Sequence, residues 1–465
     1  MCLKKKIICS FLYLMIISLV IFFYGPNTSY KEMCALVVID IIICLYYIYT
    51  ENCLKLIDAR FLFVIATIFF TFGEDICYFF FENSLTEGMK RICFYRYGEN
   101  IVKIGSQFTV LAFNFFILGL FYKTNLKIII PGIKIKEKYK KYYIDAAHWI
   151  GRIMVILSFI PEIIYLSAEI SLFFTSGYGN TALENLPGIV IRYQYMFIPG
   201  MIILLLAKNQ KKEKIRFIVL TLISLSIIYL SMGDRGKGLA IFVVLFWIKI
   251  INSKKIKLKK YIFIAIIIFL LIPLVKFYRI AYTLNIFSPF SYAVEQMFIE
   301  NPIIDILLEL GGTQEILILT MEKVRVEGIA YGKAYLDFFI EMLPGFFGIQ
   351  RNYITLAKWL INTTGYQTIG FSIWGEAYLN FKYLGIPFMF FLGFLFNKLL
   401  NSEKKNILKI ILTANTLYFF IDISRRSLAG FGYNFLYNIL LPVFIIYLLG
   451  EYFGKKSNER QQNES

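Results

Sequence analysis

Long runs of apolar residues, separated by polar connections, cover most of the chain. Crossing a membrane as a helix takes about 20 residues, and twelve runs reach or approach this length. They lie at residues 7–24, 33–49, 61–81, 101–122, 147–172, 188–206, 215–231, 239–251, 261–280, 384–400, 407–423 and 433–450. The pattern predicts an all-α integral membrane protein with about twelve transmembrane helices.

One connection is much longer than the others. Residues 281–383 contain stretches with apolar residues at helical spacing, which Pro289, Pro302 and Pro344 interrupt. We expect short amphipathic or re-entrant helices there, because a connection of this length usually carries function. The predicted organisation is spans one to nine (1–280), the long loop (281–383), spans ten to twelve (384–450) and a tail (451–465).

The composition agrees with a membrane protein, since 58% of the residues are hydrophobic and only 17% are charged. Lys and Arg concentrate in alternate connections: KNQKKEKIR (208–216) carries five, and TSGYGNTALENLPG (175–188) carries none. Cytoplasmic connections hold the excess of these residues. We therefore place both termini in the cytoplasm and the long loop outside. The net charge of +18 is assigned to topology and to contacts with anionic lipid, rather than to nucleic acid.

Arginine is distributed differently from lysine. The predicted cytoplasmic segments contain only Arg60, Arg216 and Arg460, whereas the predicted outer segments are rich in arginine. A guanidinium group matches two phosphate oxygens at once, which an ammonium group cannot do. The pattern indicates either an anionic ligand bound outside or ordinary arginines at the membrane interface. The outer arginines that we single out for ligand contacts are Arg192, Arg279, Arg351, Arg425 and Arg426.

The turn GDRGKG (233–238) joins the seventh and eighth spans on the predicted outer side. Gly236 and Gly238 would let a ligand approach the backbone, and the N–H groups that begin the next helix favour an anion. Arg235 and Lys237 would supply positive charge. The turn is either a phosphate-binding cradle or a plain polar hairpin.

Glu376 is the first candidate for proton transfer. It lies in GEAYLNFKYLG (375–385), among aromatic residues just before the tenth span, and an acid in such surroundings suits proton transfer. The alternative is a buried carboxylate that pairs with a nearby arginine. Glu341 of the long loop is the reserve candidate, and we expect most other acids of that loop to face water.

The sequence suggests no metal or cofactor site. The seven cysteines lie in the first 93 residues without C-x-x-C spacing, and His148 is the single histidine. The motifs of P-loops and of zinc-dependent hydrolases are absent from the sequence. We therefore expect neither a metal nor a cofactor.

Two motifs and the overall plan resemble those of the Wzy-type polymerases of O-antigen and capsular repeat units. GDRGKG is similar to the family's G-x-R-G element. GEAYLNFKYLG is similar to its E-A-Y-x-N-F-G-x-x-G element, with Lys382 where the family more often has glycine. The resemblance implies a GT-C-like fold in the cytoplasmic membrane, and it adds Tyr378 and Asn380 to the candidate substrate-binding residues.

The resemblance also implies an activity. The protein would polymerise polyprenyl-diphosphate-linked oligosaccharide repeat units into an O-antigen or capsule on the outer face of the membrane. Arg235, with Lys237, Gly236 and Gly238, would hold one diphosphate, and Glu376 or Glu341 would activate the acceptor hydroxyl. Membrane lipid, a chain-length regulator and a flippase are the other expected partners. The alternatives are a lipid-linked oligosaccharide flippase, an O-antigen ligase and a structural membrane scaffold.

Overall fold

The apolar runs form helices, because a backbone in lipid must satisfy its hydrogen bonds within its own segment. The structure is a computed structural model, and every regular element that its described residues form is a helix. The chain divides into two compact units. The described residues are 2–51, 58–82, 93–122, 136–176, 186–207, 212–252, 270, 273–278, 280–282, 284–299, 301–343, 359–360, 370–401 and 406–463.

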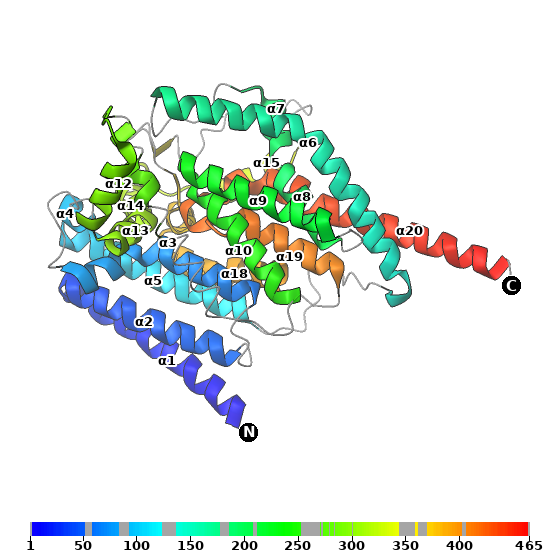
Figure 1. Ribbon diagram of the computed structural model, residues 1–465. Coiled ribbons are helices and arrows are strands. Elements are labelled where there is room, and N and C mark those ends of the chain that lie inside the picture. The colour runs from blue at the N-terminus through cyan, green and yellow to red at the C-terminus, as the bar shows by residue number, and fades with distance from the viewer. Residues whose placement is uncertain are drawn as a thin grey trace. The chain divides into compact units, whose positions relative to one another are not determined.

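The first unit comprises Met1–Lys123, Lys257–Lys398 and Ile421–Phe431. Its N-terminal part consists of α1 (Cys2–Tyr24), α2 (Tyr30–Glu51), α3 (Ala59–Phe81), α4 (Cys93–Tyr97) and α5 (Glu99–Phe121). The long loop contributes short helices, as expected: α12 (Pro289–Ile299), α13 (Pro302–Gly311), α14 (Thr313–Glu327) and α15 (Lys333–Glu341) (Figure 1). The unit is completed by α17 (Ile373–Phe381), α18 (Gly385–Leu400) and the short turns η8 (Ile423–Arg425) and η9 (Ala429–Phe431).

The second unit comprises Thr124–Ile256, Leu399–Phe420 and Gly432–Ser465. Its helices are α6 (Lys140–Ser176), α7 (Gly188–Gln194), α8 (Phe197–Leu206), α9 (Lys212–Met232), α10 (Arg235–Asn252), α19 (Ile407–Phe420), the π-helix η10 (Asn434–Leu440) and α20 (Leu441–Asn463). Two turn residues, Tyr195 and Met196, separate α7 from α8. The sixth predicted span is therefore two helices in succession.

Ten helices among the described residues are long and apolar enough to cross a membrane. They match ten of the twelve predicted runs. The eighth run forms α10, which has 18 residues, and most of the ninth run lies outside the described residues. The all-α membrane class is thus confirmed, while the number of spans and their orientation stay predictions.

A helix of the long loop crosses the helix bundle of the first unit at a pair of glycines. A Cβ on Gly73 of α3 would lie closer than 3.0 Å to the backbone of α13, and a Cβ on Gly311 would meet the backbone of α3 equally closely. Real side chains do not tolerate such contacts, so this crossing requires glycine on both helices. The Thr313 hydroxyl also donates to the carbonyl oxygen of Phe70 (2.7 Å). The helix α13 and the start of α14 are therefore packed against α3.

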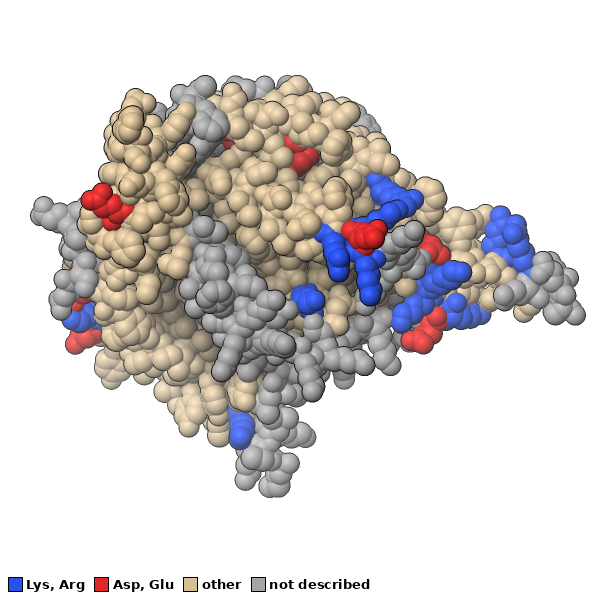
Figure 2. All heavy atoms as spheres, in the orientation of Figure 1, with Lys and Arg blue, Asp and Glu red and all other residues tan. Residues whose placement is uncertain are grey.

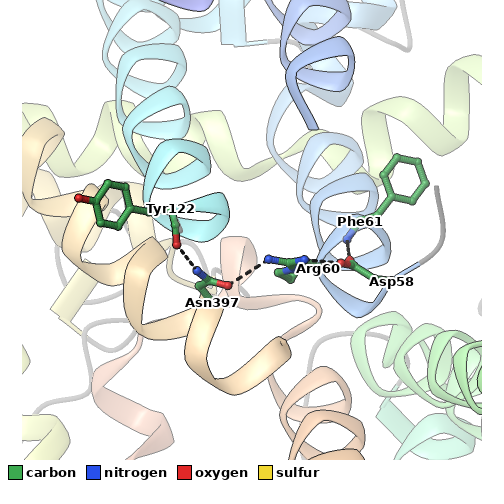
Figure 3. A network of polar contacts seen from close by, with 5 residues as sticks. All are labelled: Asp58, Arg60, Phe61, Tyr122 and Asn397. Atoms are coloured by element: carbon green, nitrogen blue, oxygen red, sulfur yellow. Dashed lines mark hydrogen bonds and ion pairs between the residues drawn. The ribbon is translucent and has the colours of Figure 1, made fainter. Parts of the chain in front are cut away.

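Arg60 connects the ends of three helices of the same unit (Figure 3). Its Nη2 donates to Asp58 Oδ2 (2.7 Å), just before α3, and its Nη1 donates to Asn397 Oδ1 of α18 (3.1 Å). Asn397 in turn donates to the carbonyl oxygen of Tyr122, which follows α5 (2.8 Å). One of the three arginines on the predicted cytoplasmic side thus has a structural role.

Large parts of the face drawn in Figure 2 carry no charged side chain, as expected of a surface that contacts lipid. Lysine and arginine gather toward the C-terminal end of α20, whose last turn contains Arg460. This distribution agrees with a helix end that leaves the apolar part of the membrane.

Candidate functional site

The GDRGKG turn ends one helix and begins the next. Gly233 follows α9 with a φ of 93°, which favours glycine. Asp234 caps α10, because its Oδ1 accepts from the N–H of Lys237 (3.1 Å) and its carbonyl oxygen accepts from the N–H of Gly238 (3.1 Å). Arg235 is the first residue of α10, and its side chain lies outside the described part of the chain. One of the N–H groups expected to bind an anion is therefore bonded to a carboxylate of the protein itself.

Lys237 is buried, with 8% of its surface exposed. Its Nζ donates to the hydroxyl oxygen of Tyr165 (3.1 Å) and lies 3.4 Å from Asp234 Oδ2. It also lies 4.6 to 5.4 Å from the ring centres of Tyr165, Tyr229 and Tyr195. Aromatic faces attract cations, most strongly where water is excluded. The contacts of this ammonium group are thus made with protein groups.

A buried acid belongs to the same group, which we call the Lys237 cluster (Glu162, Tyr165, Tyr195, Tyr229, Asp234 and Lys237). The Tyr229 hydroxyl donates to Glu162 Oε1 (2.6 Å). Glu162 Oε2 is buried and has no hydrogen-bond partner among the described residues. Ionisable groups inside a membrane protein are costly unless they are paired or serve a function. The cluster places one ammonium group and two carboxylates near the start of α10.

Three further predicted residues of the second unit lie on α7 and α10. The Arg192 guanidinium lies 5.5 Å from the ring centre of Tyr433, and Gly236 is half-buried in the first turn of α10. The Gly238 carbonyl oxygen accepts from Ser226 Oγ (2.5 Å), and a Cβ at Gly238 would clash with the side chain of Leu230. Gly238 therefore allows α9 and α10 to approach closely.

In the first unit, residues Ile421–Phe431 form a segment that we call the arginine turn. Arg426 Nε donates to Asp422 Oδ2 (2.7 Å), and the backbone N–H of Arg425 donates to the carbonyl oxygen of Asp422 (2.8 Å). The Arg425 guanidinium lies 5.7 Å from the ring centre of Phe70 on α3. Asp422, which is 5% exposed, thus fixes the backbone of one arginine and the side chain of the next.

Glu376 binds the main chain of the arginine turn. Its side chain is fully buried, its Oε2 accepts from the N–H of Leu428 (2.6 Å), and its Oε1 accepts from the N–H of Ala429 (3.2 Å). A candidate membrane-spanning helix, Ile373–Leu400, contains both Glu376 and the tenth predicted run, whereas the sequence had placed Glu376 just before that run. Its carboxylate therefore links α17 to the segment that carries Arg425 and Arg426.

The other residues of the second motif also make contacts inside the first unit. Asn380 Nδ2 donates to the carbonyl oxygen of Glu376 (2.8 Å), and its Oδ1 accepts from the N–H of Ala334 on α15 (3.2 Å). The Tyr378 ring packs edge-on against Phe108, with 5.2 Å between ring centres. These contacts fix α17 against its neighbours.

Tyr335 of α15 lies in the electrostatic field of Glu376. Burial, together with this carboxylate, raises the pKa of the Tyr335 phenol well above its ordinary value, so the phenol keeps its proton. Its buried hydroxyl has no hydrogen-bond partner among the described residues. The ring stacks on Phe381 at 5.9 Å between centres. Tyr335 was not predicted from the sequence.

The remaining predicted residues fall elsewhere. Glu341 is half-buried at the end of α15, while Arg279 and Arg351 lie outside the described residues. No group of three or more His, Cys, Asp or Glu within the described ranges is arranged to hold a metal ion. Of the predicted residues, Gly236, Lys237 and Gly238 thus lie together at the start of α10 in the second unit, and Glu376 contacts the segment that carries Arg425 and Arg426 in the first unit.

The tyrosines of the Lys237 cluster were also missed in the sequence. Tyr165 lies three residues after Glu162, and residues at this spacing share one face of a helix. That spacing was the available signal, since a buried acid needs polar neighbours. Tyr195 and Tyr229 come from other helices, and no local pattern connects them to Lys237.

Comparison with known proteins identifies the family. No curated protein and no solved structure matches the chain significantly. The family model described as O-antigen polysaccharide polymerase Wzy matches residues 6–457, which is nearly the whole chain and includes both motifs. The chain therefore belongs to the Wzy family of O-antigen polysaccharide polymerases.

Proposed function

We propose that this O-antigen repeat-unit polymerase uses polyprenyl-diphosphate-linked glycans as donors and works on the outer face of the cytoplasmic membrane. Family membership gives the polymerising activity. The donor and the side of the membrane are our inference, and they rest on the charge asymmetry of the connections and on the arginines of the predicted outer segments.

The observation that carries the proposal is the arginine turn. Asp422 and Glu376 hold this segment firmly, although it presents two adjacent arginines. Cations held in a fixed position stabilise the negative charge that develops on a leaving diphosphate, without reorganisation during the reaction. Guanidinium groups are suited to this task, because they bind phosphate oxygens in pairs. Arg425 and Arg426 would serve one diphosphate in this way.

The start of α10 would serve the other diphosphate. Arg235 is the proposed contact, with the Gly236 backbone beside it and Arg192, Arg279 and Arg351 as further candidates. The Lys237 cluster fixes the first turn of α10 through Asp234 and Tyr165. Lys237 and Gly238, which make contacts inside the second unit, would thus act by holding Arg235 in place. Tyr378 and Asn380 would in the same way hold α17, whose Glu376 binds the arginine turn.

The reaction transfers the growing glycan from one lipid to another. The acceptor hydroxyl of a lipid-linked repeat unit attacks the anomeric carbon of the donor, a new C–O bond forms, and the bond between that carbon and the diphosphate breaks. The polyprenyl diphosphate leaves, and the hydroxyl proton passes to a base. Glu376 and Glu341 are the predicted candidates for this base. A chain-length regulator and a flippase are the expected protein partners.

The test is the length distribution of surface glycan in a strain that lacks the gene. Complementation with the natural gene should restore long chains, while Arg235→Ala should leave glycan with a single repeat unit, although the variant still inserts into the membrane. Arg216→Ala, at the predicted cytoplasmic start of α9, is the matched control and should restore long chains. Full-length polymer with Arg235→Ala would overturn the role of Arg235.

The same experiment separates the alternatives. Loss of all surface glycan from the deletion strain, with accumulation of lipid-linked repeat units, would indicate a flippase or a ligase instead of a polymerase. An unchanged glycan ladder in the deletion strain would mean that the protein does not act on that glycan.

A further inference from the structure

We propose that Glu376 is a positioning residue: its carboxylate holds the arginine turn in the geometry that binds the donor diphosphate. This inference rests on the proposed function, and it assigns Glu376 a role other than that of the general base. Glu376 would act through the backbone N–H groups of Leu428 and Ala429, which belong to the arginine turn.

Glu376 accepts hydrogen bonds from the main chain of the arginine turn. Each carboxylate oxygen of Glu376 accepts one main-chain N–H, from Leu428 at 2.6 Å and from Ala429 at 3.2 Å. Both donors follow Arg426 within three residues, and Asp422 holds the other side of the same turn through Arg426 Nε. Two main-chain N–H groups of one turn are thus bound by a single side chain. The two acids together fix both ends of the segment that carries the arginines.

The helix that bears Glu376 is held by its neighbours at several points. The Ser372 side chain caps α17 by accepting from the N–H of Trp374 (3.2 Å), and Asn380 ties the same helix to α15 through Ala334 (3.2 Å). The Trp374 indole N–H donates to Thr71 on α3 (3.1 Å). A side chain on a helix that is held at several points has a fixed position, and it fixes the position of the group that it binds. Glu376 can therefore set the place of the turn.

Glu376 is poorly placed to take the proton of the acceptor hydroxyl. A general base needs an oxygen that can approach the acceptor hydroxyl within hydrogen-bond distance, but both oxygens of Glu376 already accept backbone N–H groups and the side chain is fully buried. In this proposal Glu376 does not take the hydroxyl proton, and Glu341 remains the candidate base. The bond between the anomeric carbon and the diphosphate breaks as the new glycosidic bond forms, the polyprenyl diphosphate leaves, and the proton passes to that base.

The experiment uses the full-length protein in lipid nanodiscs. The substrate is the lipid-linked single repeat unit extracted from a strain that lacks the gene, and inorganic diphosphate serves as the competing ligand. Glu376→Gln replaces one acceptor oxygen with a donor, which faces a backbone N–H. The expected result is a diphosphate inhibition constant that rises by about 10- to 100-fold, together with a lower kcat/KM, because displaced arginines also stabilise the leaving diphosphate less.

A double-mutant cycle identifies the route of the effect. In a background that carries Arg425→Ala and Arg426→Ala, Glu376→Gln should change the diphosphate inhibition constant little further, because its effect passes through these arginines. Glu315→Gln is the matched control: it also alters a carboxylate of the same unit that accepts hydrogen bonds, from Arg96 and Tyr97, and should leave both constants unchanged.

Four results would overturn the proposal or its premise. A fall in kcat with unchanged KM and inhibition constant would make Glu376 a base. Equal effects in both backgrounds would mean that Glu376 does not act through the arginines. If wild-type protein polymerises the substrate without inhibition by diphosphate, the diphosphate site fails, whereas absence of polymerisation by wild type contradicts the proposed function itself. Glu376→Asp, which keeps both oxygens on a shorter side chain, carries the same test if Glu376→Gln does not fold.

Discussion

The ammonium group of Lys237 lies 3.1 Å from the hydroxyl oxygen of Tyr165. The two residues come from α10 and α6, so this bond connects the first turn of one helix to the middle of another. Because Asp234 binds both the ammonium group and the backbone of Lys237, the charge of the lysine also stabilises the helix cap. A residue that looks like a ligand contact in the sequence thus bonds to protein groups that fix the first turn of α10.

The Lys237 cluster leads to a prediction about stability. Lys237→Met should lower the free energy of unfolding by at least about 2 kcal/mol, because it removes the cation from the three tyrosine rings and leaves Asp234 and Glu162 without it. Thermal unfolding in detergent measures the effect. Lys249→Met, an exposed lysine in the last turn of the same helix, is the control and should change little. An unaltered melting temperature for Lys237→Met would contradict the role of the cluster.

The arginine turn leads to a prediction about activity. Arg426→Lys keeps the charge but loses the planar fork and the Nε contact with Asp422 (2.7 Å), so we expect the polymerisation rate to fall by about tenfold or more. The rate of glycan extension in nanodiscs is the measurement. Arg460→Lys in the C-terminal tail is the control. If Arg426→Lys polymerises at the wild-type rate, charge alone suffices at this position.

The backbone at Lys382 leads to a third prediction. This residue ends α17 with φ 48° and ψ −131°, a region that favours glycine. Lys382→Gly should therefore raise the free energy of unfolding by about 1 kcal/mol, although glycine is more flexible in the unfolded chain. Lys456→Gly, in the exposed interior of α20, should lower it by about 1 kcal/mol. Destabilisation by Lys382→Gly would show that the lysine side chain makes a contact that outweighs the backbone strain.

The buried hydroxyl of Tyr335 leads to a fourth prediction. It has no hydrogen-bond partner among the described residues, so Tyr335→Phe should keep the ring packing against Phe388 (4.8 Å) and raise the free energy of unfolding by about 1 kcal/mol. Tyr229→Phe removes a comparable hydroxyl that donates to Glu162 (2.6 Å), and should have the opposite effect. Equal melting temperatures for the two variants would contradict this assignment.

The sequence was sufficient to predict the class of fold and the short helices of the long loop. Apolar runs form helices in lipid, because a helix satisfies its backbone hydrogen bonds within its own segment. The candidate helix that contains the tenth run begins at Ile373, and the sequence did not indicate this start because Glu376 and the polar residues near it interrupt the apolar pattern. The sequence showed which charged and polar residues were candidates for the site, but it did not show which residues they would contact. Nothing local to Glu376 indicates that its acceptors would meet the N–H groups of Leu428 and Ala429, about 50 residues later in the chain.

At Lys382 the sequence comparison and the backbone conformation agree. The comparison of motifs singled out this position because the family more often has glycine there, and the backbone has a positive φ at this residue. By contrast, the glycines of GDRGKG were interpreted as room for a ligand, whereas the structure shows that Gly238 serves the contact between α9 and α10. A glycine in a sequence indicates a close approach, but it does not identify the approaching group.

The glycine crossing between α3 and α13 has a consequence for how the protein is made. Roughly 240 residues separate Gly73 from Gly311, and at about 5–20 residues per second their synthesis takes on the order of 10 to 50 seconds. During that interval α3 has left the ribosome, but the helix that covers its glycine face does not yet exist. The neighbouring acids Glu74 and Asp75, both buried in the finished protein, must be shielded in the meantime by water, by the insertion machinery or by another helix. The surface of α3 is therefore completed only late in translation.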